Sequence, residues 1–189
     1  MHIEPQSPRF SCESIPGGIQ AIVPARRNWF VILFMSAWLV GWFSGEASAI
    51  EELISPDKKT PQLFMAVWLI GWTIGGIFAF GAVLWQLVGR EVISITSSAL
   101  EHRIEILGIA RSRIYRIGEI RNLRAAEFST NPFTSQTAWF PSVVGSGFGP
   151  VAFDYGARTM RVAPSLEEAE AKLLVDKLSA YLPRNASAI

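Results

Sequence analysis

Arginine is the one polar residue type that gathers in this sequence at a spacing suited to binding. Five arginines fall within fourteen residues of a predicted sheet region: Arg111, Arg113, Arg116, Arg121 and Arg124. Alternation along a strand puts the first two on one face. Beside a membrane, anionic headgroups attract each such residue by about 1 kcal/mol. The cluster is therefore a candidate surface for a lipid or a partner protein.

Two other interpretations of the arginine cluster stay open. The simpler one is a solvated sheet face, on which Glu105, Glu119 and Glu127 form the common, weak ion pairs of protein surfaces. The other is a protein-binding face, where an exposed sheet edge accepts a strand from a partner.

The remaining reactive residue types do not form a catalytic or metal site. Gly145-Ser146-Gly147 lacks the G-x-S-x-G elbow, a following helix and a phosphate-binding lysine. His102 lies in a predicted exposed strand with no orienting partner, and Cys12 is the only cysteine. Asp154 and Tyr155 are assigned to hydrogen bonding and packing in a hairpin. We expect no catalytic residue, no metal, no cofactor and no enzymatic activity.

Composition separates the chain into an apolar and a polar portion. Half of the 189 residues are hydrophobic and 17% are charged, against about 25% charged in an ordinary soluble domain. Six of the seven tryptophans lie between Trp29 and Trp85, where charged residues are sparse. The net charge of +1 gives no bulk attraction for nucleic acid. These features indicate a membrane portion joined to a soluble portion.

Two uncharged segments carry the membrane prediction. They run for 17 residues, from Trp29 to Gly45, and for 27, from Leu63 to Gly89. About 20 apolar residues are needed to cross the hydrocarbon core, so the first segment reaches that length only with Asn28 and residues 46–50 at the interfaces. We predict helices over about 28–49 and 62–89. Neither has an ionisable residue in its middle, which disfavours transport.

Flanking charges predict the orientation of these helices. Arg26 and Arg27 precede the first segment, and Arg90 follows the second. The positive-inside rule then places both termini of a two-pass protein in the cytoplasm and the connecting loop on the periplasmic or extracellular side. A cleaved signal peptide ending at Ala47-Ser48-Ala49 is the rival interpretation, but about 28 residues precede its apolar core, more than such peptides carry.

The two apolar segments repeat one sequence. LFMSAWLVGWFSG, from Leu33 to Gly45, and LFMAVWLIGWTIG, from Leu63 to Gly75, are identical at eight of thirteen positions. Helical spacing puts the tryptophans and glycines of each copy on one face, where small residues favour helix contacts in lipid. The helix-packing residues we assign are Trp38, Gly41, Trp42, Gly45, Trp68, Gly71, Trp72 and Gly75.

An antiparallel arrangement makes the two repeat copies complementary. If residues of equal depth have numbers that sum to about 113, each tryptophan lies level with a glycine, as Trp42 does with Gly71 and Trp72 with Gly41. Isoleucine at Gly41 or Gly71 is then expected to loosen the hairpin. Shared ancestry without pairing, and dimerisation of two chains through the glycine faces, are the alternatives.

The soluble portion predicts several antiparallel strands followed by one helix. Period-two patterns from residue 92 to 125 are separated at Gly108 and Gly118, which mark turns. Residues 19–23 form a short strand before the membrane, 129–146 a long loop, and 148–155 with 159–162 a last hairpin. Ser165 as N-cap, with Glu168 three residues later, begins the closing helix, and Pro183 ends it. Its apolar stripe comprises Ala171, Leu174, Val175, Leu178, Tyr181 and Leu182.

Two membrane helices followed by GREVISI…LEHRIEILGIARSRIYRIGEIRNLR resemble bacterial membrane-anchored proteins with a pleckstrin-homology-like domain. The resemblance covers about residues 89–182. It implies a bent, roughly seven-stranded antiparallel sheet or barrel closed by the C-terminal helix. The two-pass layout is also similar to that of the photosystem I assembly factor of cyanobacteria and chloroplasts.

The fold class we expect is thus a membrane α-helical hairpin plus an α+β soluble domain. Its parts are an N-terminal cytoplasmic segment (1–27), the hairpin (28–89), the cytoplasmic domain (90–183) and a tail (184–189). The expected function is a non-enzymatic scaffold or interaction module. The alternatives are an anionic-lipid sensor and an accessory subunit of a membrane enzyme complex. The expected partners are the bilayer and other membrane proteins or a second copy, but no nucleic acid.

Overall fold

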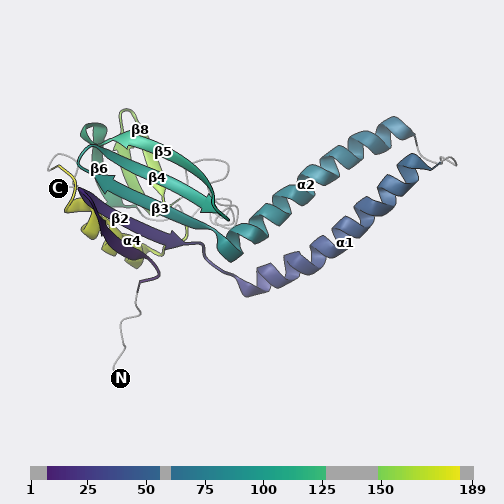
Figure 1. The fold of residues 1–189 in the computed structure, drawn as a ribbon, viewed down its shortest axis with the longest axis horizontal. Helices are drawn as coiled ribbons and strands as arrows, with labels where there is room; N and C mark the ends of the chain where they lie inside the picture. The colour runs from purple at the N-terminus through teal and green to yellow at the C-terminus, as the bar shows by residue number, and fades with distance from the viewer. Residues whose placement is uncertain (1–7, 56–60, 127–148, 184–189) are drawn as a thin grey trace, which may run out of the picture. The chain divides into compact units, whose positions relative to one another are not determined.

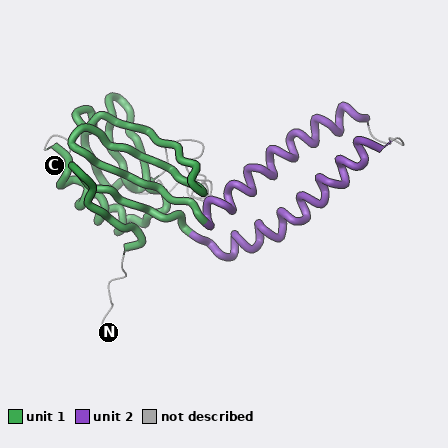
Figure 2. The backbone as a smooth tube through the Cα atoms, in the orientation of Figure 1, with its two compact units in different colours: residues 1–26, 88–189 green, residues 27–87 purple. Residues whose placement is uncertain are grey.

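The protein is described here from a computed structural model, in which residues 8–55, 61–126 and 149–183 are described. The chain divides into two compact units (Figure 2). Residues 1–26 and 88–189 form one, called the sheet unit below, and residues 27–87 form the other, called the helical hairpin. The N-terminal residues therefore belong to the same unit as residues 90–183, whereas the sequence predicted a separate segment over residues 1–27.

A five-stranded antiparallel sheet contains most strands of the sheet unit (Figure 1). Its strands are β1 (Ser11–Ile15), β2 (Gly18–Pro24), β3 (Arg90–Thr96), β4 (Ala99–Ile106) and β5 (Ile109–Arg116), neighbours in that order. Gly17 and Gly108 adopt positive φ angles of 75° and 83° at the tight turns after β1 and β4. Glycine meets this requirement without a steric penalty.

A second antiparallel sheet has three strands, β6 (Ile120–Ala125), β7 (Val151–Tyr155) and β8 (Arg158–Val162). The short 3₁₀ helix η1 (Ile117–Glu119) lies between β5 and β6, so the hydrogen-bonded ladder does not continue from one sheet into the other. In the described part of the chain the strands thus form two sheets, and the single closed barrel implied by the family resemblance is not found.

One hydrophobic core draws residues from both sheets and from the helix α4 (Glu168–Ser179). Ala171, Leu174 and Leu178 of the predicted stripe are buried, whereas Tyr181 is exposed. The helix begins later than expected. Glu167 is its N-cap, and the reciprocal capping-box bonds join Glu167 to Glu170 rather than Ser165 to Glu168. Ser165 is instead buried in the turn where Leu166 N–H bonds to the Ala163 carbonyl.

The helical hairpin is inserted between two neighbouring strands of one sheet. Pro24 at the end of β2 pairs with Arg90 at the start of β3, and Ala25 N–H donates to the Gly89 carbonyl at 2.9 Å. Both ends of the hairpin are therefore fixed to one point of the sheet. Strand β2 is the strand predicted at residues 19–23, and it contributes Ile19, Ala21 and Val23 to the core.

The two helices of the hairpin are long and apolar. They are α1 (Trp29–Ile54), capped by the Asn28 side chain, and α2 (Gln62–Val88). At 1.5 Å per residue, their 26 and 27 residues span about 40 Å, more than the roughly 30 Å hydrocarbon core. Both are long and apolar enough to cross a membrane. Helix α1 ends five residues beyond the predicted boundary at residue 49 and includes Ala47-Ser48-Ala49.

Candidate functional site

The five clustered arginines lie on two different sheets. Arg111, Arg113 and Arg116 are on β5, at the edge of the larger sheet, and Arg121 and Arg124 are on β6, at the edge of the smaller one. Successive side chains of β5 do alternate between the two faces of the sheet, because Tyr115 is buried while Ile114 is exposed. Arg111 and Arg113 therefore share the face of Tyr115, as predicted. The structure thus distributes the cluster over two edges and does not gather it on one strand face.

Ion pairs within the sheet unit engage part of the arginine cluster. Arg116 lies 3.7 Å from Glu119, and Arg124 lies 3.1 Å from Asp154. Glu105, an expected partner, pairs with Arg90 instead, and Glu127 lies outside the described residues. Arg111 and Arg121 are exposed. The positive charge that this cluster offers to a ligand is therefore smaller than the five arginines in the sequence would suggest.

Asp154 is the centre of a small polar network on the smaller sheet. Its carboxylate accepts hydrogen bonds from the Thr159 hydroxyl at 2.7 Å, and from Asn122 and Arg124, both at 3.1 Å. The bond from Thr159, followed by those from Asn122 and Arg124, lowers the pKa of Asp154. Asn122 adopts a positive φ of 53° where the β6–β7 register shifts between Arg121 and Arg124. The network matches a structural role and keeps this carboxylate ionised.

His102 is buried, contrary to the exposed position expected from the sequence. Its Nε2 lies 3.1 Å from Glu91 Oε2, and the His102 and Glu91 side chains are only 3% and 1% exposed. The same glutamate oxygen accepts the Ala163 N–H at 3.0 Å. Ala163 has a positive φ of 60°, which costs a non-glycine residue free energy that surrounding contacts must offset.

A sequence signal for the buried histidine existed. Leu100, His102 and Ile104 share a strand face by period-two alternation, so the face assigned to the core by Leu100 includes His102. The partner could not be inferred, because Glu91 comes from the neighbouring strand β3. The hydrogen bond between Glu91 and Ala163 joins residues that are 72 positions apart in the sequence.

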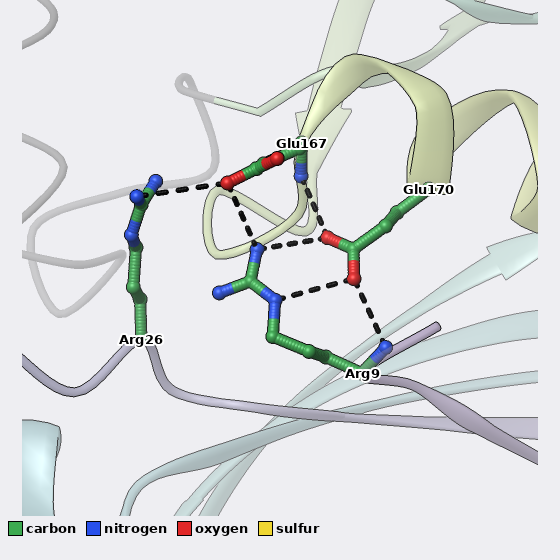
Figure 3. A network of polar contacts seen from close by, with 4 residues as sticks. All are labelled: Arg9, Arg26, Glu167 and Glu170. Atoms are coloured by element: carbon green, nitrogen blue, oxygen red, sulfur yellow. Dashed lines mark hydrogen bonds and ion pairs between the residues drawn. The ribbon is translucent and has the colours of Figure 1, made fainter. Parts of the chain in front are cut away.

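A second ionic network fixes the N-terminal segment to α4 (Figure 3). Arg9 donates to the Glu170 carboxylate from its backbone N–H at 2.9 Å, from Nε at 3.2 Å and from Nη2 at 2.8 Å. Glu167 lies 3.6 to 3.7 Å from both Arg26 and Arg9. Burial raises the pKa of Glu170, but the hydrogen bonds from Arg9 and from the Glu167 N–H outweigh it and lower that pKa to about 2.

Four of the repeat residues form a continuous stack of tryptophan rings in the hairpin. Centroid distances are 4.4 Å from Trp38 to Trp42, 4.0 Å from Trp42 to Trp72 and 4.3 Å from Trp72 to Trp68. Trp72 Nε1 also donates to the Trp42 carbonyl at 3.3 Å. The two inner rings of this tryptophan stack come from different helices, so the repeat joins α1 to α2.

The glycines of the repeat divide into two groups. A Cβ atom on Gly75 would lie 3.2 Å from the Trp42 ring, and one on Gly45 would lie 3.6 Å from the Trp72 ring, whereas neither Gly41 nor Gly71 has anything within 4 Å of such an atom. Tryptophan does lie against glycine. The residue numbers of each facing pair sum to 117, four more than the sum of 113 in the predicted register. The atoms that approach Gly45 and Gly75 belong to rings and not to backbone.

Glu46 is a polar residue within α1, where the sequence predicted an interfacial position. Helix α1 continues for eight residues beyond Glu46, to Ile54. The Thr73 hydroxyl of α2 donates to its carboxylate. Beside this pair, Ile50 and Leu53 of α1 and five residues of α2 line an apolar groove of about 430 Å³.

Other candidate residues add no reactive group. Gly145, Ser146 and Gly147 lie outside the described residues, as does the predicted 129–146 loop. Burial raises the pKa of the Cys12 thiol, which keeps it protonated and weakly nucleophilic. Among the described residues, no three His, Cys, Asp or Glu side chains are grouped so that they could hold a metal ion.

No protein-family model matches this chain, and a comparison with curated proteins finds no significant match.

Proposed function

We propose that this chain is a two-pass membrane protein whose hairpin anchors the sheet unit as a non-enzymatic scaffold or interaction module. The observation that carries the proposal is the insertion of two long apolar helices into the β2–β3 connection. Such an insertion attaches one folded unit to the membrane through two covalent links.

The surface of the hairpin supports its location in a membrane. Large apolar side chains are exposed along both helices, including Phe30 at 78% and Leu63 at 79%. Soluble monomers rarely expose contiguous apolar surface of this kind, because its hydration is unfavourable. A helix from the core of a soluble protein would instead bury most of these side chains.

The strand pairing supports the proposed topology. Since β2 and β3 pair in one sheet, both ends of the hairpin must lie on the same side of the bilayer, which an even number of crossings allows. Arg26, Arg27 and Arg90 at these ends favour the cytoplasmic side. Signal-peptide cleavage after Ala49 would remove β1 and β2, and with them the core residues Ile19, Ala21 and Val23.

The resemblance to pleckstrin-homology-like domains remains part of the proposal. Two antiparallel sheets sharing a core with a C-terminal helix are compatible with it. We further propose the bacterial inner membrane as the location.

Strand β5 is the surface we assign to a protein partner. It is the outer strand of the larger sheet and exposes Ile109 at 80% and Ile114 at 69%, next to the exposed Arg111. Exposed apolar side chains at a sheet edge favour the addition of a strand from a partner. In the alternative of an anionic-lipid sensor, Arg111 would bind the lipid headgroup. In the alternative of an accessory subunit of an enzyme complex, the β5 edge would bind the other subunit.

Photo-crosslinking of the full chain in native membranes tests this assignment. A photoreactive residue at Ile114 is expected to give a discrete protein adduct, and one at Leu173 of α4, which is also exposed, is the control. Arg111→Glu should reduce the adduct if the partner strand is acidic. Adducts with phospholipid alone would favour lipid sensing. Absence of any adduct specific to Ile114 would contradict the interaction module.

A further inference from the structure

Strand β5 has one edge without a partner strand. It is the last strand of the larger sheet, and among the described residues no strand pairs with its outer side. All eight of its residues pair with β4 in one continuous register. A proline and a β-bulge, two features that commonly block pairing at an edge strand, are both missing from β5. The edge is therefore able to accept another strand.

The turn before β5 determines which backbone groups point to this free edge. Leu107 and Gly108 have positive φ angles of 49° and 83°, as in the type I′ turn of a two-residue hairpin. In such a turn the N–H of Ile109 donates to the carbonyl of Ile106, its partner in the register. Hydrogen-bonded and non-hydrogen-bonded pairs alternate along an antiparallel ladder. The β5 residues whose N–H and C=O groups point away from β4 are therefore Ala110, Ser112 and Ile114.

The side chains of β5 indicate the charge of a strand that would pair there. The strand contains three arginines and no acidic residue. In an added antiparallel strand, the residue opposite Arg111 forms a non-hydrogen-bonded pair, in which the Cα atoms are only about 4.5 Å apart and the side chains are closest. Opposite charges stabilise such a pair and like charges destabilise it. An acidic residue opposite Arg111 is therefore favoured.

We infer that β5 binds an antiparallel strand of a partner protein, with an acidic residue opposite Arg111 and apolar residues opposite Ile109 and Ile114. The inference rests on the proposed interaction module and specifies the partner of that surface. Ile109 and Ile114 are 80% and 69% exposed, and the apolar residues would cover them. From its N-terminus, the partner strand reads apolar, two residues of any type, acidic, one residue of any type, apolar.

Charge complementarity selects this occupant over a second copy of the chain and over a lipid. Two β5 strands side by side would bring together the three arginines of each, with no acidic residue in either strand. An anionic phospholipid would pair with Arg111. It would leave the outward N–H and C=O groups of β5 without partners, because main-chain hydrogen bonds come only from an added strand.

A synthetic peptide with the predicted pattern tests the inference on the full chain in detergent micelles. The probe is the end-capped, fluorescently labelled peptide Thr-Val-Thr-Thr-Glu-Thr-Val-Thr, and its control has Lys in place of Glu. We expect fluorescence anisotropy to show binding of the Glu peptide and at least about tenfold weaker binding of the Lys peptide, a difference of 1.4 kcal/mol. Equal affinity of the two peptides, or no binding of the Glu peptide, would overturn the inference.

Methylation of single peptide nitrogens tests the backbone ladder without altering the protein. The fourth residue of the probe lies opposite Ser112, where its N–H would bond to β5. The third lies opposite Arg113, where its N–H points away from β5. N-methylation of the fourth residue should abolish binding, and N-methylation of the third should have a much smaller effect. Equal effects would show that the peptide does not extend the sheet.

Variants of the protein provide the complementary test. Ser112→Pro removes one outward N–H but keeps the bonds to β4, since proline is tolerated where an edge-strand N–H faces solvent. It should weaken binding of the Glu peptide at least about tenfold, whereas Ser112→Ala should not. Arg111→Glu should reverse the preference in favour of the Lys peptide. Arg158→Glu, at an exposed position of β8, is the charge-matched control and should leave the preference unchanged.

Failure of this inference can be told apart from failure of the proposed function. The protein adduct from a photoreactive residue at Ile114 is measured in native membranes for the Ser112→Pro and Arg111→Glu variants. If neither substitution reduces the adduct, the interaction module stands and the addition of an acidic strand is overturned. An adduct of two copies of this chain would also overturn the acidic partner alone. Absence of an adduct specific to Ile114 would overturn the interaction module and its partner together.

Discussion

At the residue scale, Glu91 organises the interior of the sheet unit. One of its oxygens accepts hydrogen bonds from the buried His102 side chain and from the backbone of Ala163. These contacts link β3, β4 and the segment after β8. A buried polar group without a partner is expensive, so the three groups depend on one another.

Glu91→Ala should destabilise the protein strongly. It leaves His102 and the Ala163 N–H without this acceptor in the core, at a cost of about 3 kcal/mol. Glu91→Gln, which keeps an acceptor oxygen, should cost clearly less. Chemical denaturation followed by near-ultraviolet circular dichroism measures both. Equal stability of the two variants would show that the hydrogen bonds of Glu91 contribute little.

The Arg9–Glu170 pair makes stability depend on pH in a defined range. The pKa of Glu170 is about 2 in the folded chain, below its ordinary value of 4.5. Its contribution is therefore fully present above pH 4.5 and is lost as the pH falls toward 2. Glu170→Gln should remove that part of the acid sensitivity and cost about 1 kcal/mol at pH 7, because Arg9 is partly exposed and solvent screens the pair.

Acid titrations of the melting temperature provide the comparison. The control is Glu168→Gln, since Glu168 forms an exposed i, i+4 pair with Lys172. Identical acid profiles for the Glu170→Gln and unsubstituted chains would contradict the assignment.

At the element scale, the two helices are held together by rings packed against glycines, with the tryptophan stack at the centre. The Trp42 Nε1 atom is buried, and no hydrogen-bond acceptor reaches it among the described residues. The ring contacts of Trp42 with Trp72 and with the glycines of α2 therefore dominate its packing. The position of each glycine relative to these rings determines whether a larger residue fits.

Gly76→Ala and Gly71→Ala should separate these two kinds of glycine. A Cβ on Gly76 would lie 2.9 Å from Trp42 Nε1, whereas one on Gly71 meets nothing within 4 Å. Overpacking of this kind costs about 1–3 kcal/mol. We expect Gly76→Ala to lower the thermal stability in detergent and to alter tryptophan fluorescence, and Gly71→Ala to change neither. A larger effect at Gly71 would favour the register first predicted from the repeat.

At the scale of the whole molecule, the hairpin is an insertion and the sheet unit is discontinuous in sequence. Figure 2 colours residues 1–26 and 88–189 as one unit, which residues 27–87 divide in the sequence. The ends of β2 and β3 are already joined by the hydrogen bond from Ala25 to Gly89. A short loop can therefore replace the hairpin.

A chain in which Asn-Gly replaces residues 27–87 should fold as a soluble domain. The four-residue connection it leaves between residues 25 and 89 is a common β-hairpin length. We expect a β-rich circular dichroism spectrum and a cooperative thermal transition. The fragment 88–189 is the control. It lacks Ile19, Ala21 and Val23 of the core and should aggregate. Cooperative folding of that fragment would show that β2 is dispensable.

Local pattern was enough to predict most individual elements of this protein. The strands of residues 90–125, the closing helix and the two long apolar helices follow from alternation, turn glycines and apolar length, which are properties of neighbouring residues. The repeat likewise indicated that tryptophan would lie against glycine. Its register could not be predicted, because axial offset depends on how whole rings pack.

The features that depend on contacts between residues distant in the sequence were decided only by the tertiary structure. Residues 11–24 read as a segment before a membrane helix, and only the pairing of β2 with β3 and of β1 with β2 makes them part of the sheet unit. His102 is buried beside Glu91 of another strand, and Glu91 also accepts the backbone N–H of Ala163. In each case the deciding energy is a hydrogen bond or a packed contact between segments that the sequence separates.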